Sequence, residues 1–333
     1  MLWRSHRMTA VCTTSSGVSR QKTSRVLSTG LALSVALAVV GAAAVAEAHA
    51  APQDSTGMPP SDELKQLRQK GEQGDVRAQF DLGFMYFTGD RVGQNFAEAA
   101  KWWRRAAEQE SPLAQLNLGA MYQKGVGVSR DYVEAAQWFR KAAEQGDATA
   151  QNDLGDAYQE GVGVAQDSVQ AVQWYRKAAE QGEATAQSSL GKAYHTGDGI
   201  SRDYAQAFQW FRKAADQGDA TARSNLGFMY QNGEGVGRDP ALAVQWWHRA
   251  AEQGNTSSQY NLGVAYNNGE GVAQDFVEAR KWAEIAVAYS AGESQRKFAA
   301  LRDALGRKMT PDDVANAQKR ARDWIEAFER RLK

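Results

Sequence analysis

The sequence is poor in cysteine, proline and histidine, with one, six and four of them in 333 residues. The single cysteine, Cys12, lies within the first 50 residues, so the rest of the chain has no disulfide and packing must stabilise it. Net charge is also lacking, because 39 basic residues balance 39 acidic ones. That balance argues against a nucleic-acid-binding protein, which carries a basic excess. A single apolar run of about 20 residues excludes a polytopic membrane protein.

The N-terminal 50 residues have the features of a targeting segment. An acid-free basic stretch precedes an apolar run at 31–45, and Ala48-His49-Ala50 follows. This order predicts a secretory signal, residues 1–50, cut after Ala50, and hence a periplasmic or secreted protein. Two alternatives are a mitochondrial transit peptide and an uncleaved N-terminal membrane anchor, and only the anchor would make a membrane a partner. Without these residues the chain keeps 34 basic and 38 acidic residues, a net charge of −4.

A period of 36 residues runs through the rest of the chain. Leu-Gly pairs end at Gly83, Gly119, Gly155, Gly191, Gly227 and Gly263. Tyrosines keep the same spacing at Tyr86, Tyr122, Tyr158, Tyr194, Tyr230 and Tyr266, and so do tryptophans at Trp102, Trp138, Trp174, Trp210, Trp246 and Trp282. Six units in register without an insertion indicate a repeat protein.

Each unit is predicted to form two helices. Ala150, Leu154 and Tyr158 share one helical face, and Gly161 suits the left-handed position that ends the helix. The second helix of a unit is expected to begin at an Asp with Glu three residues on, as at Asp131. This is a capping box, in which each side chain bonds the other residue's backbone amide.

Two-helix units of this size must stack to bury their apolar faces, which predicts an all-α solenoid. Glycine at the Leu-Gly step and Ala-Ala pairs such as Ala142-Ala143 allow helices to approach closely. The repeated Trp is expected to fill the space between them.

The pattern A-x-x-x-L-G-x-x-Y-x-x-G-x-G-V-x-x-D-x-x-x-A-x-x-W-x-x-K-A-A-E-Q-G resembles the Sel1-like repeats, relatives of the tetratricopeptide class. It runs from Ala78 through Ile285 and departs at Arg91 and Glu110, which replace turn glycines in the first unit. The resemblance implies a right-handed α/α superhelical solenoid of six 36-residue helix–turn–helix repeats with helical caps. It also implies an adaptor that binds protein partners in envelope assembly or signalling.

The ends are predicted to cap the array. We expect a flexible leader at 51–61, an N-terminal cap helix at 62–77, six repeats at 78–289 and a C-terminal helical cap at 290–333. A short amphipathic helix carries Phe298, and a second begins at Thr310 with Trp324 and Phe328 on its apolar face. The alternative is that this last helix binds a partner or forms a homodimer, with Trp324 and Phe328 as anchors.

No catalytic motif stands out, and we predict no catalytic residue, metal site or cofactor. His195 and His248 lie in different repeats, and there is no H-E-x-x-H, G-x-S-x-G or P-loop. The runner-up is a penicillin-binding type of cell-wall enzyme that uses the Ser-x-x-Lys pair Ser189/Lys192. No S-D-N or K-T-G accompanies that pair.

Binding information must lie where the repeats differ. The positions three before, one after and four after each Leu-Gly glycine form one stripe of the first helix, which lines the concave side in this family. Partner-binding residues are predicted on this stripe at Phe80, Phe84, Phe87, Leu116, Asp156, Lys192, His195, Phe228, Tyr260 and Val264. Exposed aromatic side chains are common interface anchors. Phe228 and Tyr260 are favoured, because no cap is predicted near them, whereas the three N-terminal Phe have the alternative of packing beneath the N-terminal cap.

Overall fold

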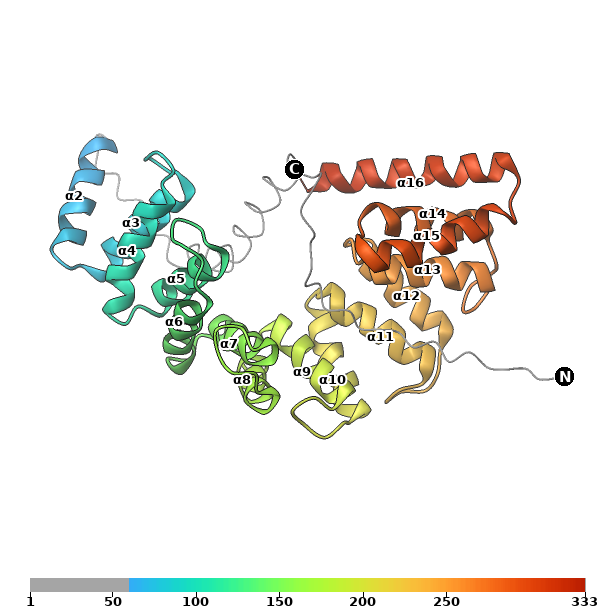
Figure 1. Cartoon of the computed structure of the whole chain (residues 1–333), viewed down its shortest axis with the longest axis horizontal. Coiled ribbons are helices and arrows are strands. Elements are labelled where there is room, and N and C mark those ends of the chain that lie inside the picture. Colours follow the sequence, from blue (N-terminus) through green and yellow to red (C-terminus); the bar gives the residue numbers. More distant parts are fainter. Residues whose placement is uncertain (1–59, 333) are drawn as a thin grey trace. The chain divides into compact units, whose positions relative to one another are not determined.

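The computed structural model describes residues 60–332, so the predicted signal and most of the leader lie outside the described residues. Within this part of the chain every regular element is a helix, and there are 15 (Figure 1). The predicted all-α solenoid is confirmed.

The repeats consist of helices of 12 or 13 residues in strict alternation. The first helices are α3 (Val76–Thr88), α5 (Pro112–Lys124), α7 (Ala148–Glu160), α9 (Ala184–Thr196), α11 (Ala220–Asn232) and α13 (Thr256–Asn268). The second helices are α4 (Phe96–Glu108), α6 (Tyr132–Glu144), α8 (Ser168–Glu180), α10 (Tyr204–Asp216), α12 (Pro240–Ala251) and α14 (Phe276–Ala288). Each helix packs on the one before it and the one after it.

Three further helices lie at the ends of the array. The first, α2 (Pro60–Glu72), packs on α3, and its Arg68 donates to the Tyr86 hydroxyl at 2.6 Å. At the other end α15 (Gly292–Gly306) and α16 (Pro311–Arg331) both pack on α14. Thr310 caps α16 by accepting from the Asp313 amide, as the sequence predicts.

The helix ends follow the predicted signals with one correction. Gly161 ends α7 with φ of 68°, and Asp131 caps α6 by accepting from the amides of Val133 and Glu134. The reciprocal half of the capping box is wrong, because the Asp131 amide donates to the Tyr122 carbonyl at 3.0 Å. This bond recurs in all six repeats and joins the two helices of each.

An aromatic ring lies directly on each glycine of the first five Leu-Gly pairs. A Cβ on Gly83 would lie 2.3 Å from Trp103, and the other four glycines would meet a ring within 2.8 Å. The ring belongs to the residue after the repeated Trp, which corrects the prediction that the repeated Trp fills this space. Repeat six has Ala283 at that position, and Leu301 of α15 approaches Gly263 instead.

A buried glutamine connects each of the first four repeats to the element before it, a feature that the sequence analysis missed. Gln115, 2% exposed, donates to the Ala107 carbonyl of α4 at 3.1 Å and accepts from Gln145 at 2.8 Å. Gln79, Gln151 and Gln187 repeat both bonds. Both hydrogen-bonding groups of the amide are therefore satisfied inside the array.

We expect Gly227→Ala to destabilise the protein by about 1–3 kcal/mol, because overpacking outweighs the better helix propensity of alanine. The new Cβ would lie 2.4 Å from Trp247, whose ring is held by a 3.3 Å hydrogen bond to the Ser224 carbonyl. Gly263→Ala is the comparison variant and should be less destabilising, because no ring lies on Gly263 and the new Cβ would meet the Ala279 carbonyl oxygen at 3.1 Å. Urea unfolding of both variants measures the difference, and equal midpoints would contradict the packing argument.

Candidate partner-binding site

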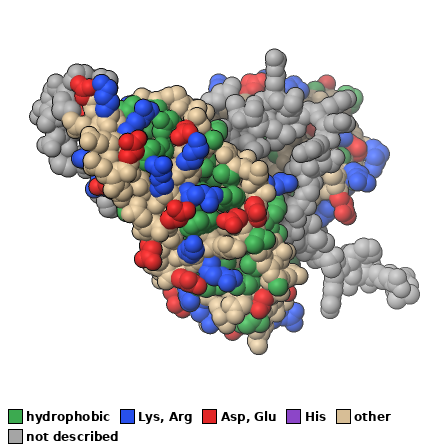
Figure 2. Space-filling view, turned by 60° about the vertical axis from the view of Figure 1, so that its left-hand side comes forward, with side chains coloured by type: hydrophobic (Ala, Val, Ile, Leu, Met, Phe, Trp, Pro, Cys, Tyr) green, Lys and Arg blue, Asp and Glu red, His purple; other side chains and the backbone are tan. Residues whose placement is uncertain are grey.

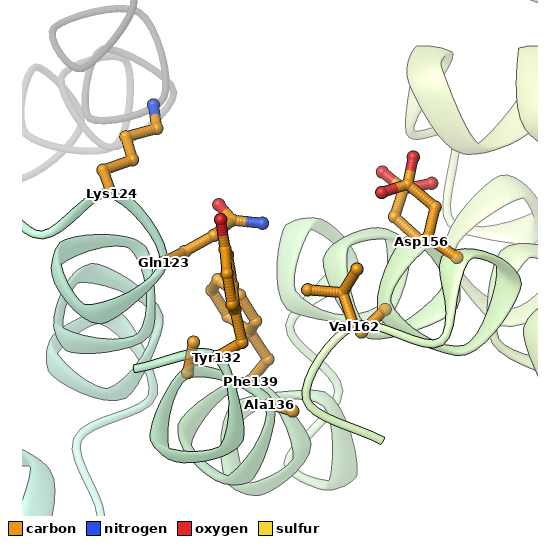
Figure 3. A pocket seen from close by; sticks show the side chains of 10 residues that line it. Gln123, Lys124, Tyr132, Ala136, Phe139, Asp156 and Val162 are labelled. Atoms are coloured by element: carbon orange, nitrogen blue, oxygen red, sulfur yellow. The ribbon is translucent and has the colours of Figure 1, made fainter. Parts of the chain in front are cut away.

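A pocket of about 350 Å³ lies where the second and third repeats meet (Figure 3). Three helices and a turn supply its walls. The lining residues are Gln123 and Lys124 of α5, Tyr132, Ala135, Ala136 and Phe139 of α6, Asp156, Ala157 and Glu160 of α7, and Val162. Its volume is in the range typical of small ligand sites.

The repeat geometry explains why these side chains meet. Gln123 and Asp156 both belong to the predicted stripe, four residues after one Leu-Gly glycine and one residue after the next. Tyr132 follows the cap residue Asp131 and is therefore the first residue of α6. Tyr132 and Glu160 were not predicted. The available signal for Glu160 was its place one helical turn after Asp156.

Asp156 is the most perturbed side chain of the lining. Its carboxylate accepts from the Tyr175 hydroxyl at 2.7 Å, and Asn152 donates to its other oxygen at 3.4 Å. Burial, opposed by the Tyr175 bond and helped by the charges of Glu160 and Glu183, raises the pKa of Asp156 to about 6. Burial likewise raises the pKa of Asp153, one turn earlier, to about 7. Raised carboxyl pKa values are common at functional sites.

Two lysines lie near these acids. Lys124 extends from α5 on the opposite side of the pocket from Asp156 (Figure 3), and burial lowers its pKa while the charge of Asp153 raises it. The charge of Lys192 on α9 lowers the pKa of Asp156. The structure thus brings together two predicted residues, Asp156 and Lys192, from neighbouring repeats.

The equivalent space between the first two repeats is filled by the chain's own side chains. Phe87 takes the place of Gln123, 36 residues earlier. Its ring packs on Phe96 and Trp103 with centroid distances of 5.2 and 5.3 Å, and these residues correspond to Tyr132 and Phe139. Phe87 is 6% exposed, so the expectation of an exposed anchor is wrong at this residue.

The space between the fourth and fifth repeats is filled in a second way. His195 and Phe228 stand 72 residues after Gln123 and Asp156. The His195 ring lies 5.9 Å from Phe228 and 5.2 Å from Tyr204, and its Nε2 is 2.6 Å from a Glu234 oxygen. Glu234 corresponds to Val162. The two predicted contacts therefore bind each other, and Phe228 is half-buried.

Other aromatic side chains predicted as contacts are engaged within the chain. Tyr260 stacks on Phe298 of α15 at 4.8 Å, which corrects the expectation that no cap lies near it. Trp324 and Phe328 stack on each other, and Trp324 packs on Trp282 of α14. In the described structure, Trp324 and Phe328 therefore pack within the chain as part of the C-terminal cap.

The remaining stripe residues divide between core and surface. Leu116 is 7% exposed and belongs to the core with Phe139 and Leu154, so it offers little surface to a partner. Phe80 packs on Trp103 of its own repeat, with 6.3 Å between the ring centroids. Phe84 and Val264 are half-buried.

Among residues 60–332 no helix is long and apolar enough to cross a bilayer, and no three His, Cys, Asp or Glu converge as metal ligands. Ser189 and Lys192 are both half-buried on α9, and no hydrogen bond joins their side chains. On the face seen in Figure 2, basic and acidic side chains are interspersed.

The Sel1 repeat family matches residues 76–111, 112–147, 148–183, 184–219, 220–255 and 256–288. The chain belongs to the Sel1 repeat family. Proteins of this family generally bind protein partners. No curated protein matches the chain.

Solved structures are similar to this Sel1 repeat chain. A Sel1 repeat protein from Oxalobacter formigenes is 35% identical, with a TM-score of 0.61, over 66% of this chain and 89% of that one. A protective antigen of uropathogenic Escherichia coli with an SLR fold is 25% identical over 81% and 88%, with a TM-score of 0.37. An immunity protein from Pseudomonas aeruginosa is 17% identical over 70% and 82%, with a TM-score of 0.39.

We expect Asp156→Asn to stabilise the fold at pH 7.5 by about 1–2 kcal/mol, a value reduced for solvent screening. The pKa of Asp156 in the folded state, about 6, exceeds its ordinary value of 3.8. The folded state thus holds the proton more tightly, and this stabilisation is lost as the pH rises from about 4 through 6. Asparagine still accepts from Tyr175, so the gain should shrink towards pH 4. Urea unfolding at pH 4.5, 6 and 7.5 tests this, and a loss of stability at pH 7.5 would contradict it.

Proposed function

We propose that this Sel1 repeat protein is a non-catalytic scaffold that holds a segment of a protein partner along the stripe of first helices. The pocket between α5, α6 and α7 is the principal contact. The observation that carries the proposal is the comparison of equivalent spaces. Two of them are filled by Phe87 and by the pair His195–Phe228, whereas the one at Asp156 is open.

The same repeat frame therefore presents different surfaces along its length. Binding proteins use concave, partly apolar sites with a few placed polar groups, and this pocket has both aromatic walls and carboxylates. Phe84 and Val264, half-buried on the stripe, and Lys192 beside Asp156 are proposed as secondary contacts. The filled spaces give the scaffold its stability, and the open one gives it a place to bind.

We further propose that the protein is exported and works in the cell envelope, in assembly or signalling. This proposal rests on the basic stretch, the apolar run at 31–45 and the Ala48-His49-Ala50 site. An absence of disulfides after residue 12 is compatible with an oxidising compartment, because the array is stabilised by packing.

Photo-crosslinking tests the scaffold. Benzoylphenylalanine at Gln123, in the pocket, is expected to form an adduct with an envelope protein, because the bound segment would lie within reach. The same group at Glu144, exposed at the end of α6 and outside the pocket lining, is the matched control. Equal adducts from both positions, or none from Gln123, would contradict a partner at this pocket.

N-terminal sequencing of the protein recovered from its host tests the proposed export. We expect the mature chain to begin at Ala51. A chain that retains residues 31–45 and fractionates with membranes would instead establish the anchored alternative.

A further inference from the structure

The pocket between α5, α6 and α7 is divided into an apolar part and an acidic part. Tyr132 of α6, 40% exposed, supplies an aromatic ring, and Val162 adds an aliphatic surface, whereas Phe139 is 1% exposed and belongs to the core. Asp156 and Glu160 stand one helical turn apart on α7, so their carboxylates share one face of the helix, and both line the pocket. A ligand for this pocket must therefore combine an apolar stem with a polar head.

The acidic part is short of positive charge. Two carboxylates at this spacing repel each other, and Glu183 of the next repeat adds a third negative charge that acts on Asp156. Lys192 offsets part of this charge. Lys124 of α5 also lines the pocket, and its charge acts on Asp153, one turn before Asp156 on α7, so two lysines face the four acids Asp153, Asp156, Glu160 and Glu183. A cation from outside would relieve the repulsion between Asp156 and Glu160.

The hydrogen-bonding groups near Asp156 also favour a cationic ligand. Beside Asp156, the side-chain oxygen of Asn152 has no hydrogen-bond partner among the described residues, although Asn152 is only 5% exposed. Acceptors thus outnumber donors on this part of α7, although Asn152 itself does not line the pocket. An anionic ligand would be repelled, and an apolar one would leave the carboxylates desolvated without a partner.

Among protein side chains, arginine matches these features best. Its guanidinium has five donors and no acceptor, binds carboxylates in a bidentate manner and stacks on aromatic rings. Its methylene stem can lie along apolar surface. Lysine offers a compact, strongly hydrated charge and lacks the planar group.

We propose that the pocket receives one arginine side chain of the partner segment, with its guanidinium on Asp156 and Glu160 and its stem against Tyr132 and Val162. This inference rests on the proposed scaffold function and gives the chemistry of its ligand.

Three tripeptides titrated into the purified protein test the proposal by NMR at pH 7.5. The probes are acetyl-Gly-Arg-Gly-amide and its citrulline and lysine counterparts, of which citrulline has the shape of arginine without the charge. The arginine peptide is expected to shift the signals of Tyr132 and Val162, and the citrulline peptide to bind at least about tenfold more weakly. Absence of binding by the arginine peptide would overturn the proposal. Equal binding by the lysine peptide would overturn the assignment to arginine.

Two sets of variants locate the binding. Asp156→Asn and Glu160→Gln should each weaken the arginine peptide about tenfold, whereas Glu144→Gln, outside the pocket lining, should leave it unchanged. Asp156→Asn is expected to fold, because other repeats carry Phe84, Ala120, Lys192, Phe228 and Val264 at this position. Unchanged binding by Asp156→Asn would overturn the proposal.

A triple variant should close the pocket with the side chains that the protein uses between its fourth and fifth repeats. Gln123→His, Asp156→Phe and Val162→Glu together reproduce the arrangement of His195, Phe228 and Glu234. The circular dichroism of this variant should match the wild type, and arginine-peptide binding should be lost. Retained binding would place the peptide elsewhere. If the peptide tests fail while crosslinks from Gln123 persist, the arginine inference is wrong and the scaffold function stands.

Discussion

The contact between a glycine and an aromatic ring sets the geometry of the whole array. In each of the first five repeats the glycine of the Leu-Gly pair has no room for a Cβ, because a ring of the second helix lies against it. The two helices are therefore held at one separation, repeat after repeat. A buried glutamine then fixes each of the first four repeats to the element before it. With spacing and stacking determined in this way, the stripe residues are left free to vary.

That freedom explains how one frame produces both closed and open junctions. The space beside the fourth residue after each Leu-Gly glycine has the same backbone walls throughout. Phe87 fills it in one place, and His195 with Phe228 fills it in another. At the sixth repeat, Lys308 beyond α15 covers it, since its ammonium donates to Asn267 at 3.3 Å and lies 5.5 Å from the centroid of the Phe276 ring. Short polar side chains leave the space open at Gln123 and Asp156.

The period, the glycine that ends each first helix and the stripe positions were predictable, because each depends on residues close together or on a fixed spacing. What the stripe residues contact was not predictable. His195 and Glu234 are 39 residues apart, and Tyr260 meets Phe298 across a repeat boundary. In the sequence, an aromatic side chain on such a stripe has the features of an interface anchor. In the folded protein it packs instead into an unfilled space within the chain. The capping box failed for a similar reason, since the tyrosine carbonyl of the preceding helix competes for the same amide. The buried glutamines carried a signal that was available, namely a polar residue repeated beside the core alanine.

The buried acids of the third repeat lower the stability of the fold, and the packing of the repeats does not require them. Burial opposes the ionisation of Asp153 and Asp156, and no other repeat has an acid at the position of Asp156. An apolar side chain there, such as the Phe of repeats one and five, packs without that penalty. Functional sites commonly retain groups that lower stability. A cation bound at these carboxylates would favour their charged form and recover the lost energy in the complex. The penalty in the free protein and the affinity in the complex would then have one physical origin.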